Sequence, residues 1–271
     1  MTRTRRFRCA AAALLMVASL QAQAAMRTRN VDWTIDGKPF RGVLVYDDAG
    51  AKSRPGLVMV PNWMGVNASA VEKAKAVAGK DYVVLVADVY GRDLRPKDAK
   101  EAGAAAGVLR GDRPLLRSRM QKAVDTLRAQ SSAPLDASRI GVFGFCFGGT
   151  AALELARAGA PLAGVVALHA GIDTTMPAQA GALKAPVLVL NGAADKGVSR
   201  EAVAKFQDEM TGAGADWQFV DLGGAVHCFA EPDAGNDPAS NCRYDERSAK
   251  RAYRIMADFF AERFAKAQPQ G

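Results

Sequence analysis

Short apolar runs recur along the chain and constrain its fold more than any other feature. They are nearly continuous in Val, Leu, Ile and Phe, as strands buried on both faces of a sheet are. The runs span residues 56–62, 81–90, 139–145, 162–170 and 185–192, with a weaker one at 216–224. Helical patterns separate most of them, and strands that alternate with helices form parallel sheets covered on both faces. The sequence therefore predicts an α/β fold with a mostly parallel central sheet.

Two segments ahead of these runs have a different pattern. Residues 31–35 and 40–48 alternate apolar and polar side chains. Alternation of this kind is typical of antiparallel strands with one solvated face. Asp36 and Gly37 lie between the two segments, and Asp-Gly favours a tight hairpin turn. We expect an antiparallel pair of strands at the start of the domain.

The helical patterns carry start signals. Asp112 is a plausible N-cap with Pro114 in the first turn, and Ser199 is a second plausible cap. The predicted helices cover residues 67–79, 112–130, 199–214 and 245–267, and an Ala-rich helix directly follows residue 146. No internal repeat, low-complexity linker or composition break follows residue 25. We therefore expect a single domain over residues 25–271.

The first 24 residues have the three parts of a secretory signal peptide. Four arginines lie within the first eight residues, Ala10–Leu20 is an apolar run of 11 residues, and an Ala-x-Ala pattern ends at Ala24. An apolar run this short does not span a bilayer core. We expect cleavage after Ala24 and a periplasmic or secreted protein. An uncleaved N-terminal anchor is the alternative.

Removal of that segment lowers the formal net charge from +8 to +4, because it contains four arginines and no acidic residue. The remaining Lys and Arg residues are scattered, so nucleic-acid binding is not expected. No G-x-G-x-x-G or C-x-x-C pattern occurs, which argues against dinucleotide or thioredoxin-type chemistry. We expect no cofactor, no metal site and no membrane association after cleavage, in a monomer or small homo-oligomer.

Three cysteines remain after the predicted cleavage: Cys146, Cys228 and Cys242. An odd number in an oxidising compartment indicates one disulfide and one free thiol. Cys228 and Cys242 flank a polar loop that a disulfide between them would staple, which leaves Cys146 free. A disulfide between Cys146 and Cys228 is the other pairing considered.

A thiol, a carboxylate and an imidazole each follow a predicted strand. Sites in open parallel sheets lie beyond the carboxyl ends of the strands. Cys146 follows the run at 139–145, Asp195 follows the run at 185–192, and His227 follows the last run. The chain order of nucleophile, acid and histidine is that of α/β hydrolases. We therefore predict Cys146, Asp195 and His227 as the catalytic residues.

The residues from Gly144 to Gly148 have the G-x-nucleophile-x-G pattern of a nucleophile elbow. Such a turn puts the thiol of Cys146 at a helix N-terminus, where free N–H groups and the helix dipole favour the thiolate. The backbone N–H groups of Phe147 and of Trp63, in the loop after the first buried run, are predicted to stabilise an oxyanion. The alternative for Cys146 is a small buried side chain in a tight junction.

Other histidine and aspartate residues suit these roles less well. His169 ends an apolar run and is interpreted as structural, because a hydrogen-bonded neutral histidine packs well in a core. Asp173 lies next to the wrong strand, and Asp221 lies inside the strand that leads to His227. These positions leave Asp195 as the predicted acid.

Four stretches resemble the dienelactone hydrolase family of α/β hydrolases, and particularly its exported bacterial members: "GFCFGG", "VLVLNGAAD", "GGAVHCFAEPDA" and "MADFFAERF". The resemblance implies that Cys146 is the nucleophile, His227 the general base and acid, and Asp195 the residue that orients the imidazole. It also implies hydrolysis of a carboxylic ester or lactone through a thioester intermediate.

The chain departs from the family pattern at two places. Asn62 stands where the family usually has a Glu that holds the resting thiol, so Cys146 is expected to pair with His227 instead. Glu231 stands where the founding enzymes have one of two arginines that clamp a substrate carboxylate, and the segment 95–103 offers no clear second arginine. The founding substrate, carboxymethylenebutenolide, is therefore not favoured. Asn62, Tyr90 and Arg92 are the candidates for the substrate pocket.

The departure at Asn62 also motivates a different hypothesis about function. In that hypothesis the fold is retained as a periplasmic binding or thiol redox-sensing protein. A disulfide between Cys146 and Cys228 would support it, because it would block the thiol. The hydrolase is the preferred interpretation, because all three catalytic residue types stand in the hydrolase order.

Overall fold

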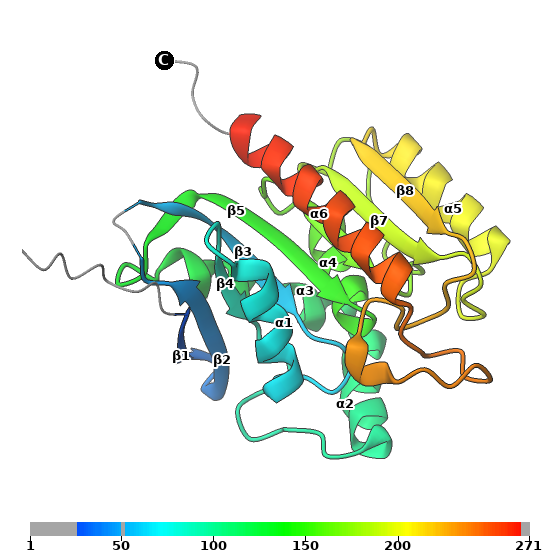
Figure 1. Cartoon of the computed structure of the whole chain (residues 1–271). Coiled ribbons are helices and arrows are strands. Elements are labelled where there is room, and N and C mark those ends of the chain that lie inside the picture. The colour runs from blue at the N-terminus through cyan, green and yellow to red at the C-terminus, as the bar shows by residue number, and fades with distance from the viewer. Residues whose placement is uncertain (1–25, 50–51, 267–271) are drawn as a thin grey trace, which may run out of the picture.

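A computed structural model describes residues 26–49 and 52–266, so the predicted signal peptide and its cleavage site lie outside the described residues. The strands form a sheet of eight in the order β1-β2-β4-β3-β5-β6-β7-β8 (Figure 1). They are β1 (Met26–Ile35), β2 (Lys38–Asp47), β3 (Arg54–Val60), β4 (Val83–Val86), β5 (Leu135–Phe145), β6 (Val165–Leu168), β7 (Val187–Gly192) and β8 (Trp217–Leu222).

The direction of the strands confirms the predicted sheet. β2 runs antiparallel to both β1 and β4, whereas every other neighbouring pair is parallel. Asp36 and Gly37 form the turn between β1 and β2, with φ values of 49° and 75°. Two successive residues at positive φ are what the tightest hairpin turns require.

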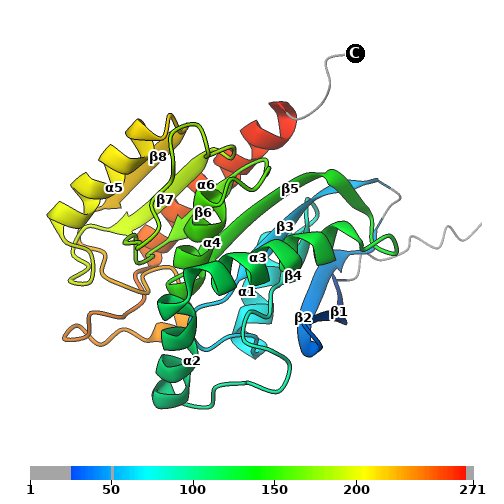
Figure 2. The ribbon, with the colours of Figure 1, turned by 180° about the vertical axis from the view of Figure 1, so that it is seen from behind.

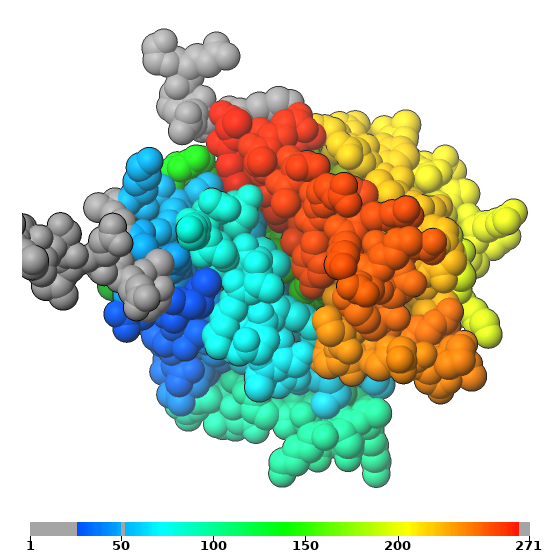
Figure 3. All heavy atoms as spheres, viewed as in Figure 1, coloured from blue at the N-terminus to red at the C-terminus, as the bar shows by residue number. Residues whose placement is uncertain are grey.

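Helices cover both faces of this sheet, as the alternating pattern predicts. α1 and α6 pack on one face (Figures 1 and 3), and α3, α4 and α5 pack on the other (Figure 2). A hollow of about 590 Å³ lies between α1 and α6. The helices are α1 (Ala68–Ala78), α2 (Ala99–Gly111), α3 (Arg113–Arg128), α4 (Phe147–Arg157), α5 (Arg200–Gly212) and α6 (Glu246–Lys266).

Both predicted helix caps are present. Asp112 accepts a hydrogen bond from the Leu115 N–H at 2.9 Å, and Ser199 accepts one from the Ala202 N–H at 3.2 Å. Each bond pairs one of the N–H groups that the first helical turn leaves without a partner. These caps fix where α3 and α5 begin.

The fold differs from the sequence prediction in three elements. β4 and β6 are shorter than the apolar runs that predict them, because the last residues of those runs leave the sheet and form loops. Tyr90 and His169 lie in these loops, and both are buried. α2 has no counterpart among the predicted helices, because its buried face consists mainly of small residues, Ala102, Ala105 and Ala106. No helix within the described ranges is long and apolar enough to cross a membrane.

Candidate active site

Cys146 occupies the sharp turn between the end of β5 and the start of α4. Its φ of 53° and ψ of −117° are strained for a residue with a side chain. A Cβ added to Gly144 would lie 2.2 Å from the carbonyl oxygen of Gly148, and one added to Gly148 would lie 2.1 Å from that of Val60. Only glycine fits at either position, so these two residues allow β3, β5 and α4 to meet behind the thiol.

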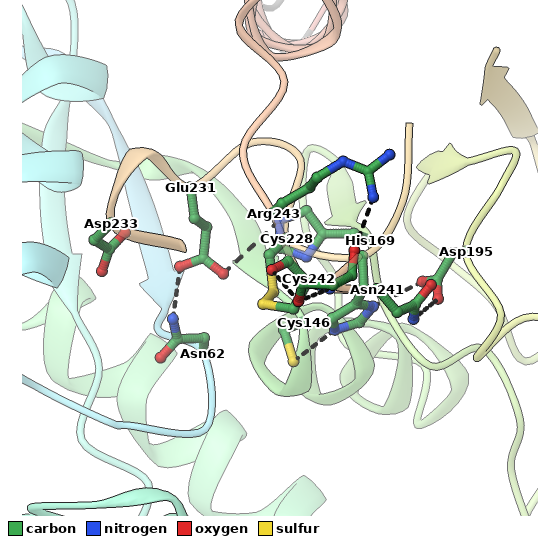
Figure 4. Close-up of a disulfide and its surroundings, with 12 residues drawn as sticks. Asn62, Cys146, His169, Asp195, Cys228, Glu231, Asp233, Asn241, Cys242 and Arg243 are labelled. Carbon is green, nitrogen blue, oxygen red and sulfur yellow. Dashed lines mark hydrogen bonds and ion pairs between the residues drawn. A yellow bond between two sulfur atoms is a disulfide. The ribbon is translucent and has the colours of Figure 1, made fainter. Parts of the chain in front are cut away.

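The structure brings together the three side chains predicted from the strand ends (Figure 4). Nε2 of His227 lies 3.0 Å from Sγ of Cys146, and Nδ1 of His227 lies 2.7 Å from Oδ2 of Asp195. The side chain of His227 is 22% exposed, whereas that of Asp195 is completely buried. The imidazole therefore connects a buried carboxylate to a thiol at the surface of the site.

Asp195 is held in its charged form by several donors. Besides His227, its carboxylate accepts hydrogen bonds from the Gly197 N–H at 2.8 Å and from Nδ2 of Asn241 at 3.0 Å. Burial alone would raise the pKa of Asp195, but the hydrogen bonds from His227, Asn241 and Gly197 outweigh it and lower the pKa. Asn241 lies 46 residues from Asp195 in sequence. Sequence reasoning missed it, because no local pattern links the two positions.

His227 is electrostatically suited to hold a second proton. Burial tends to lower its pKa, but the hydrogen bonds and charges of Asp195 and Cys146 oppose that effect and raise the pKa to about 10. Near neutral pH the ring therefore carries a proton on each nitrogen, one facing Asp195 and one facing Cys146. The protonated ring lies between the carboxylate of Asp195 and Sγ of Cys146.

The two backbone N–H groups predicted for the oxyanion hole lie at suitable places in the fold. Phe147 is the first residue of α4, and an N–H at this position has no partner inside the helix. Trp63 lies in the turn after β3, and its N–H donates to no other group in the described part of the chain. The neighbouring turn is fixed by a hydrogen bond of 2.9 Å from the Gly65 N–H to the Asn62 carbonyl.

None of the three pocket candidates, Asn62, Tyr90 and Arg92, lines the cavity beside Cys146. Tyr90 is buried, its hydroxyl donates to the Trp63 carbonyl at 2.9 Å, and its ring stacks on Phe147 at 5.8 Å. It therefore supports both predicted oxyanion donors instead of lining the cavity. Arg92 is exposed and pairs with Asp93, away from the cavity at Cys146.

A cavity of about 200 Å³ opens beside the thiol and contains two arginines that sequence reasoning missed. It is lined by Arg110, Arg113, Cys146, Phe147, Thr150, Gly171, Asp173 and His227. Arg110 lies in the last turn of α2, a helix that the sequence did not predict, and Arg113 begins α3. The guanidinium of Arg110 lies 5.5 Å from the centre of the Phe147 ring.

Arg113 is incompletely paired inside the protein. Its Nε and Nη1 atoms are buried and have no hydrogen-bond partner among the described residues. Nη2 reaches the Asp173 carbonyl at 3.4 Å, and the nearest contact to Glu154 is 3.9 Å. Burial lowers the pKa of Arg113, with the charge of Glu154 opposing it. An arginine remains charged under such a shift, so the cavity contains a cation that a bound anion could pair.

Cys228 and Cys242 form a disulfide, the pairing that the flanked loop favours (Figure 4). Cys146 is the free thiol of the described residues. The disulfide lies directly beside the catalytic loop, since the backbone of His227 pairs with that of Cys242 and its carbonyl accepts from the Arg243 N–H at 3.1 Å. The alternative disulfide between Cys146 and Cys228 is absent. The redox-sensing hypothesis is therefore not favoured.

The side chain of Asn62, the third pocket candidate, makes its hydrogen bonds with groups other than the thiol of Cys146. Its Nδ2 donates to Oε2 of Glu231 at 2.6 Å (Figure 4).

His169 is fully buried, with its ring 5.3 Å from that of His227 and no hydrogen-bond partner on either nitrogen among the described residues. Burial lowers the pKa of His169 well below its ordinary value. A neutral, buried histidine agrees with the structural role expected for it, although the expected hydrogen bonds are absent.

Among the described residues, no group of three or more His, Cys, Asp or Glu side chains could hold a metal ion. The arrangement that is present consists of a thiol, an imidazole, a buried carboxylate and two backbone N–H groups predicted as donors. These are the parts that acyl transfer to and from a protein nucleophile requires.

The fold and the strand-end constellation define an α/β hydrolase. The sequence model of the dienelactone hydrolase family matches residues 40–264, and the chain belongs to this family of hydrolases. A protein of Salmonella typhimurium named as a candidate carboxymethylenebutenolidase is 26% identical over 217 residues, which are 77% of each chain.

Solved structures agree with this assignment. A dienelactone hydrolase-like promiscuous phosphotriesterase from metagenomic libraries is 36% identical, with a TM-score of 0.82 over 89% of this chain and 99% of that one. The dienelactone hydrolase of Anabaena variabilis is 20% identical, with a TM-score of 0.65 over 88% of this chain and 98% of that one. The second likeness shows the fold alone.

Proposed function

We propose that the protein hydrolyses carboxylic ester or lactone bonds by nucleophilic catalysis, with Cys146 as the nucleophile. The observation that carries this proposal is the unbroken line of contacts from Asp195 through His227 to Cys146, 2.7 Å and 3.0 Å long. The line ends at a nucleophile elbow beside a cavity. Cys146, His227 and Phe147 all line that cavity, so an ester carbonyl bound there meets the thiol, the imidazole and one of the two predicted oxyanion donors.

In the first half of the reaction, Sγ of Cys146 attacks the carbonyl carbon. The negative charge that develops on the carbonyl oxygen is stabilised by the N–H groups of Trp63 and Phe147. The proton on Nε2 of His227 then passes to the leaving oxygen, and the bond between the carbonyl carbon and that oxygen breaks. The products are an alcohol and a thioester on Cys146. In a lactone, the alcohol remains part of the bound acyl group.

In the second half, water attacks the thioester. His227, now neutral, takes a proton from the water as it adds to the carbonyl carbon. The carbon–sulfur bond breaks, the acid leaves, and the thiolate of Cys146 pairs again with protonated His227. Asp195 stays ionised throughout and holds the imidazole in the orientation that both steps need.

The cavity favours acyl groups that carry a negative charge. Arg110 and Arg113 both line it, and Arg113 has two buried nitrogen atoms without partners. A carboxylate on the substrate would satisfy these donors, and charge-assisted bonds to arginine are strong and directional. We therefore propose small acidic esters or lactones as preferred substrates, with neutral esters as poorer ones.

The test is a panel of p-nitrophenyl esters and lactones, with and without a carboxylate, assayed with the wild type and Cys146→Ala. Hydrolysis above the uncatalysed rate by the wild type alone is expected. Equal rates for the two proteins would refute the proposal. A phosphate triester belongs in the panel, because a relative 36% identical to this chain is described as a promiscuous phosphotriesterase.

The charge preference is tested separately with Arg113→Gln and Arg110→Gln. We expect each change to raise KM for an acidic ester about 10-fold, a magnitude appropriate to a lost charge-assisted hydrogen bond, and to leave KM for a neutral ester unchanged. Arg92→Gln is the matched control, because this arginine is exposed and lies outside the cavity. Equal effects on acidic and neutral esters would contradict the preference.

We also propose that the protein is exported. The N-terminal pattern and the pairing of Cys228 with Cys242 both support an oxidising compartment. N-terminal sequencing of the protein from fractionated cells should give a chain that begins at Ala25. A chain that keeps its first 24 residues in the soluble cell interior would contradict export.

A further inference from the structure

We propose that Glu231 is a positioning residue for this reaction, because its carboxylate, acting through the side chain of Asn62, holds the loop that presents the Trp63 N–H. The proposal deepens the function proposed above and rests on it. Neither Glu231 nor Asn62 touches Cys146 or lines the cavity beside it.

Glu231 is a buried carboxylate fixed by two strong donors. It is 2% exposed, and its Oε2 atom accepts from Nδ2 of Asn62 at 2.6 Å (Figure 4). The same atom accepts from Nζ of Lys73 at 2.8 Å. Lys73 is itself 9% exposed and also pairs with Asp233 at 2.8 Å. Burying a carboxylate is costly unless it is paired and hydrogen-bonded. These contacts leave Glu231 little freedom to move.

Asn62 connects Glu231 to the predicted oxyanion loop, which is the turn after β3 that contains Trp63. While its Nδ2 donates to Glu231, its Oδ1 accepts from the Met64 N–H at 3.0 Å. The hydroxyl of Tyr90 donates to the Trp63 carbonyl at 2.9 Å, which belongs to the same peptide group as the Met64 N–H. This peptide group is therefore held at both ends. The Trp63 N–H, one peptide earlier, is left free for the substrate.

An amide is the side chain that this position requires. It donates to a carboxylate and accepts from an N–H at the same time, whereas an ionised carboxylate at position 62 could only accept. A second carboxylate 2.6 Å from Glu231 would also repel it strongly. Asn62 in place of the family's glutamate and Glu231 in place of its arginine thus form a complementary pair.

The pair connects the oxyanion loop to the loop that supplies the base. Glu231 lies four residues after His227, and its N–H donates to the Cys228 carbonyl at 2.9 Å. Cys228 is tied to Cys242 by the disulfide. The segment from His227 to Glu231 therefore carries both the imidazole that contacts the thiol and the carboxylate that holds Asn62.

Two variants, Asn62→Ala and Glu231→Leu, test the role with two reactions of the same thiol. For the ester that the wild type hydrolyses fastest, we expect kcat/KM to fall about 10-fold or more, since loss of a whole oxyanion donor costs about 10²- to 10³-fold. Alkylation of Cys146 by iodoacetamide forms no oxyanion, so its rate should stay within about 2-fold of the wild type by the same argument.

Asp233→Asn is the matched control. It removes a carboxylate charge from the same lysine but has no contact with Asn62, so hydrolysis and alkylation should both stay near wild-type rates. Asn62→Ala leaves the ion pair of Glu231 and Lys73 intact, which gives a test that does not depend on folding of the Glu231 variant.

The outcomes separate this inference from the proposed function. An active wild type whose two variants hydrolyse esters normally overturns the inference alone. An equal fall in hydrolysis and alkylation also overturns it, because Glu231 would then act on the thiol and not on the oxyanion loop. A wild type that hydrolyses no ester of the panel contradicts the proposed function, and the inference with it.

Discussion

The loop after β6 and the loop after β8 each place a histidine at the carboxyl edge of the sheet, with the two rings only 5.3 Å apart. His227 has a partner on each ring nitrogen and a pKa raised to about 10. His169 is fully buried, has no hydrogen-bond partner on either nitrogen in the described structure, and has a pKa well below the ordinary value because of burial.

The difference shows that a position beyond a strand end is not enough to raise the pKa of a histidine. The carboxylate of Asp195 and the thiol of Cys146 overcome the burial of His227 and stabilise its charged form. His169 faces the aromatic rings of Phe145 and Phe229, and the nearest carboxylate oxygen, on Glu231, lies 3.9 Å away. Burial and the charge of His227 outweigh the charge of Asp195, so the surroundings of His169 favour its neutral form.

The largest expected effect is that of His227→Ala. This change removes the proton carrier for both halves of the reaction, so kcat/KM for an activated ester should fall about 10³-fold or more. Steady-state kinetics on the best ester of the panel measures it. A fall of less than about 10-fold, well below the usual contribution of a general base, would remove His227 from the mechanism.

Asp195→Asn should have the next largest effect. An amide at this position keeps the size of the side chain but no longer favours the required form of the imidazole, so kcat should fall about 10²- to 10⁴-fold. Asp221→Asn is a control, because this aspartate lies on β8 and contacts Asn191 instead of His227. If the two variants kept the same kcat, Asp195 would have no role in orienting the base.

The pH dependence follows from the raised pKa of His227. Below about pH 10 its Nε2 proton is available for the leaving group, and above that pH the proton is lost, so kcat/KM should fall through a single step near pH 10. Asp195→Asn removes one cause of the raised pKa, so the step should move to lower pH. If the fall in kcat/KM occurred at the same pH in Asp195→Asn, the Asp195 carboxylate would not be a cause of the raised pKa of His227.

The same shift affects stability. A folded-state pKa above the ordinary 6.5 means that protonated His227 contributes to the free energy of unfolding fully below pH 6.5. That contribution is lost as the pH rises through about 10. Denaturant unfolding of the wild type and His227→Gln at several pH values should therefore show the two stabilities converging in this range. A constant difference would contradict the raised pKa.

The smallest effect is expected for His169→Leu. The ring is neutral and makes no hydrogen bond, so replacing it with an apolar side chain breaks no hydrogen bond. We expect activity within about 3-fold of the wild type and no fall in Tm beyond a few degrees, because hydrophobic swaps of similar volume usually cost little. A loss as large as that of His227→Ala would show that the two histidines share the reaction.

Much of the site could be predicted from sequence because its parts follow strands. The apolar runs at 139–145 and 185–192 place Cys146 and Asp195 at one edge of the sheet, and the last run does the same for His227. The glycines of the elbow have steric roles that a local pattern reveals.

The residues that sequence reasoning missed are connected only by tertiary contacts. Arg110 lies on α2, whose buried face consists mainly of alanines, and Arg113 lies at the start of α3, where the sequence does not show that it faces the cavity. Asn241 approaches Asp195 across a long loop. Arg92, which does follow an apolar run, is exposed, and its side chain pairs with Asp93.

The most direct test of the central claim is to trap the acyl-enzyme. Wild-type protein mixed with a slowly deacylating p-nitrophenyl ester should release a burst of p-nitrophenol close to one equivalent. Mass spectrometry of the quenched protein should then place the acyl mass on the peptide that contains Cys146, and hydroxylamine should remove it, as expected for a thioester. Catalysis with no acyl mass on Cys146, or the acyl group on a different residue, would contradict the account.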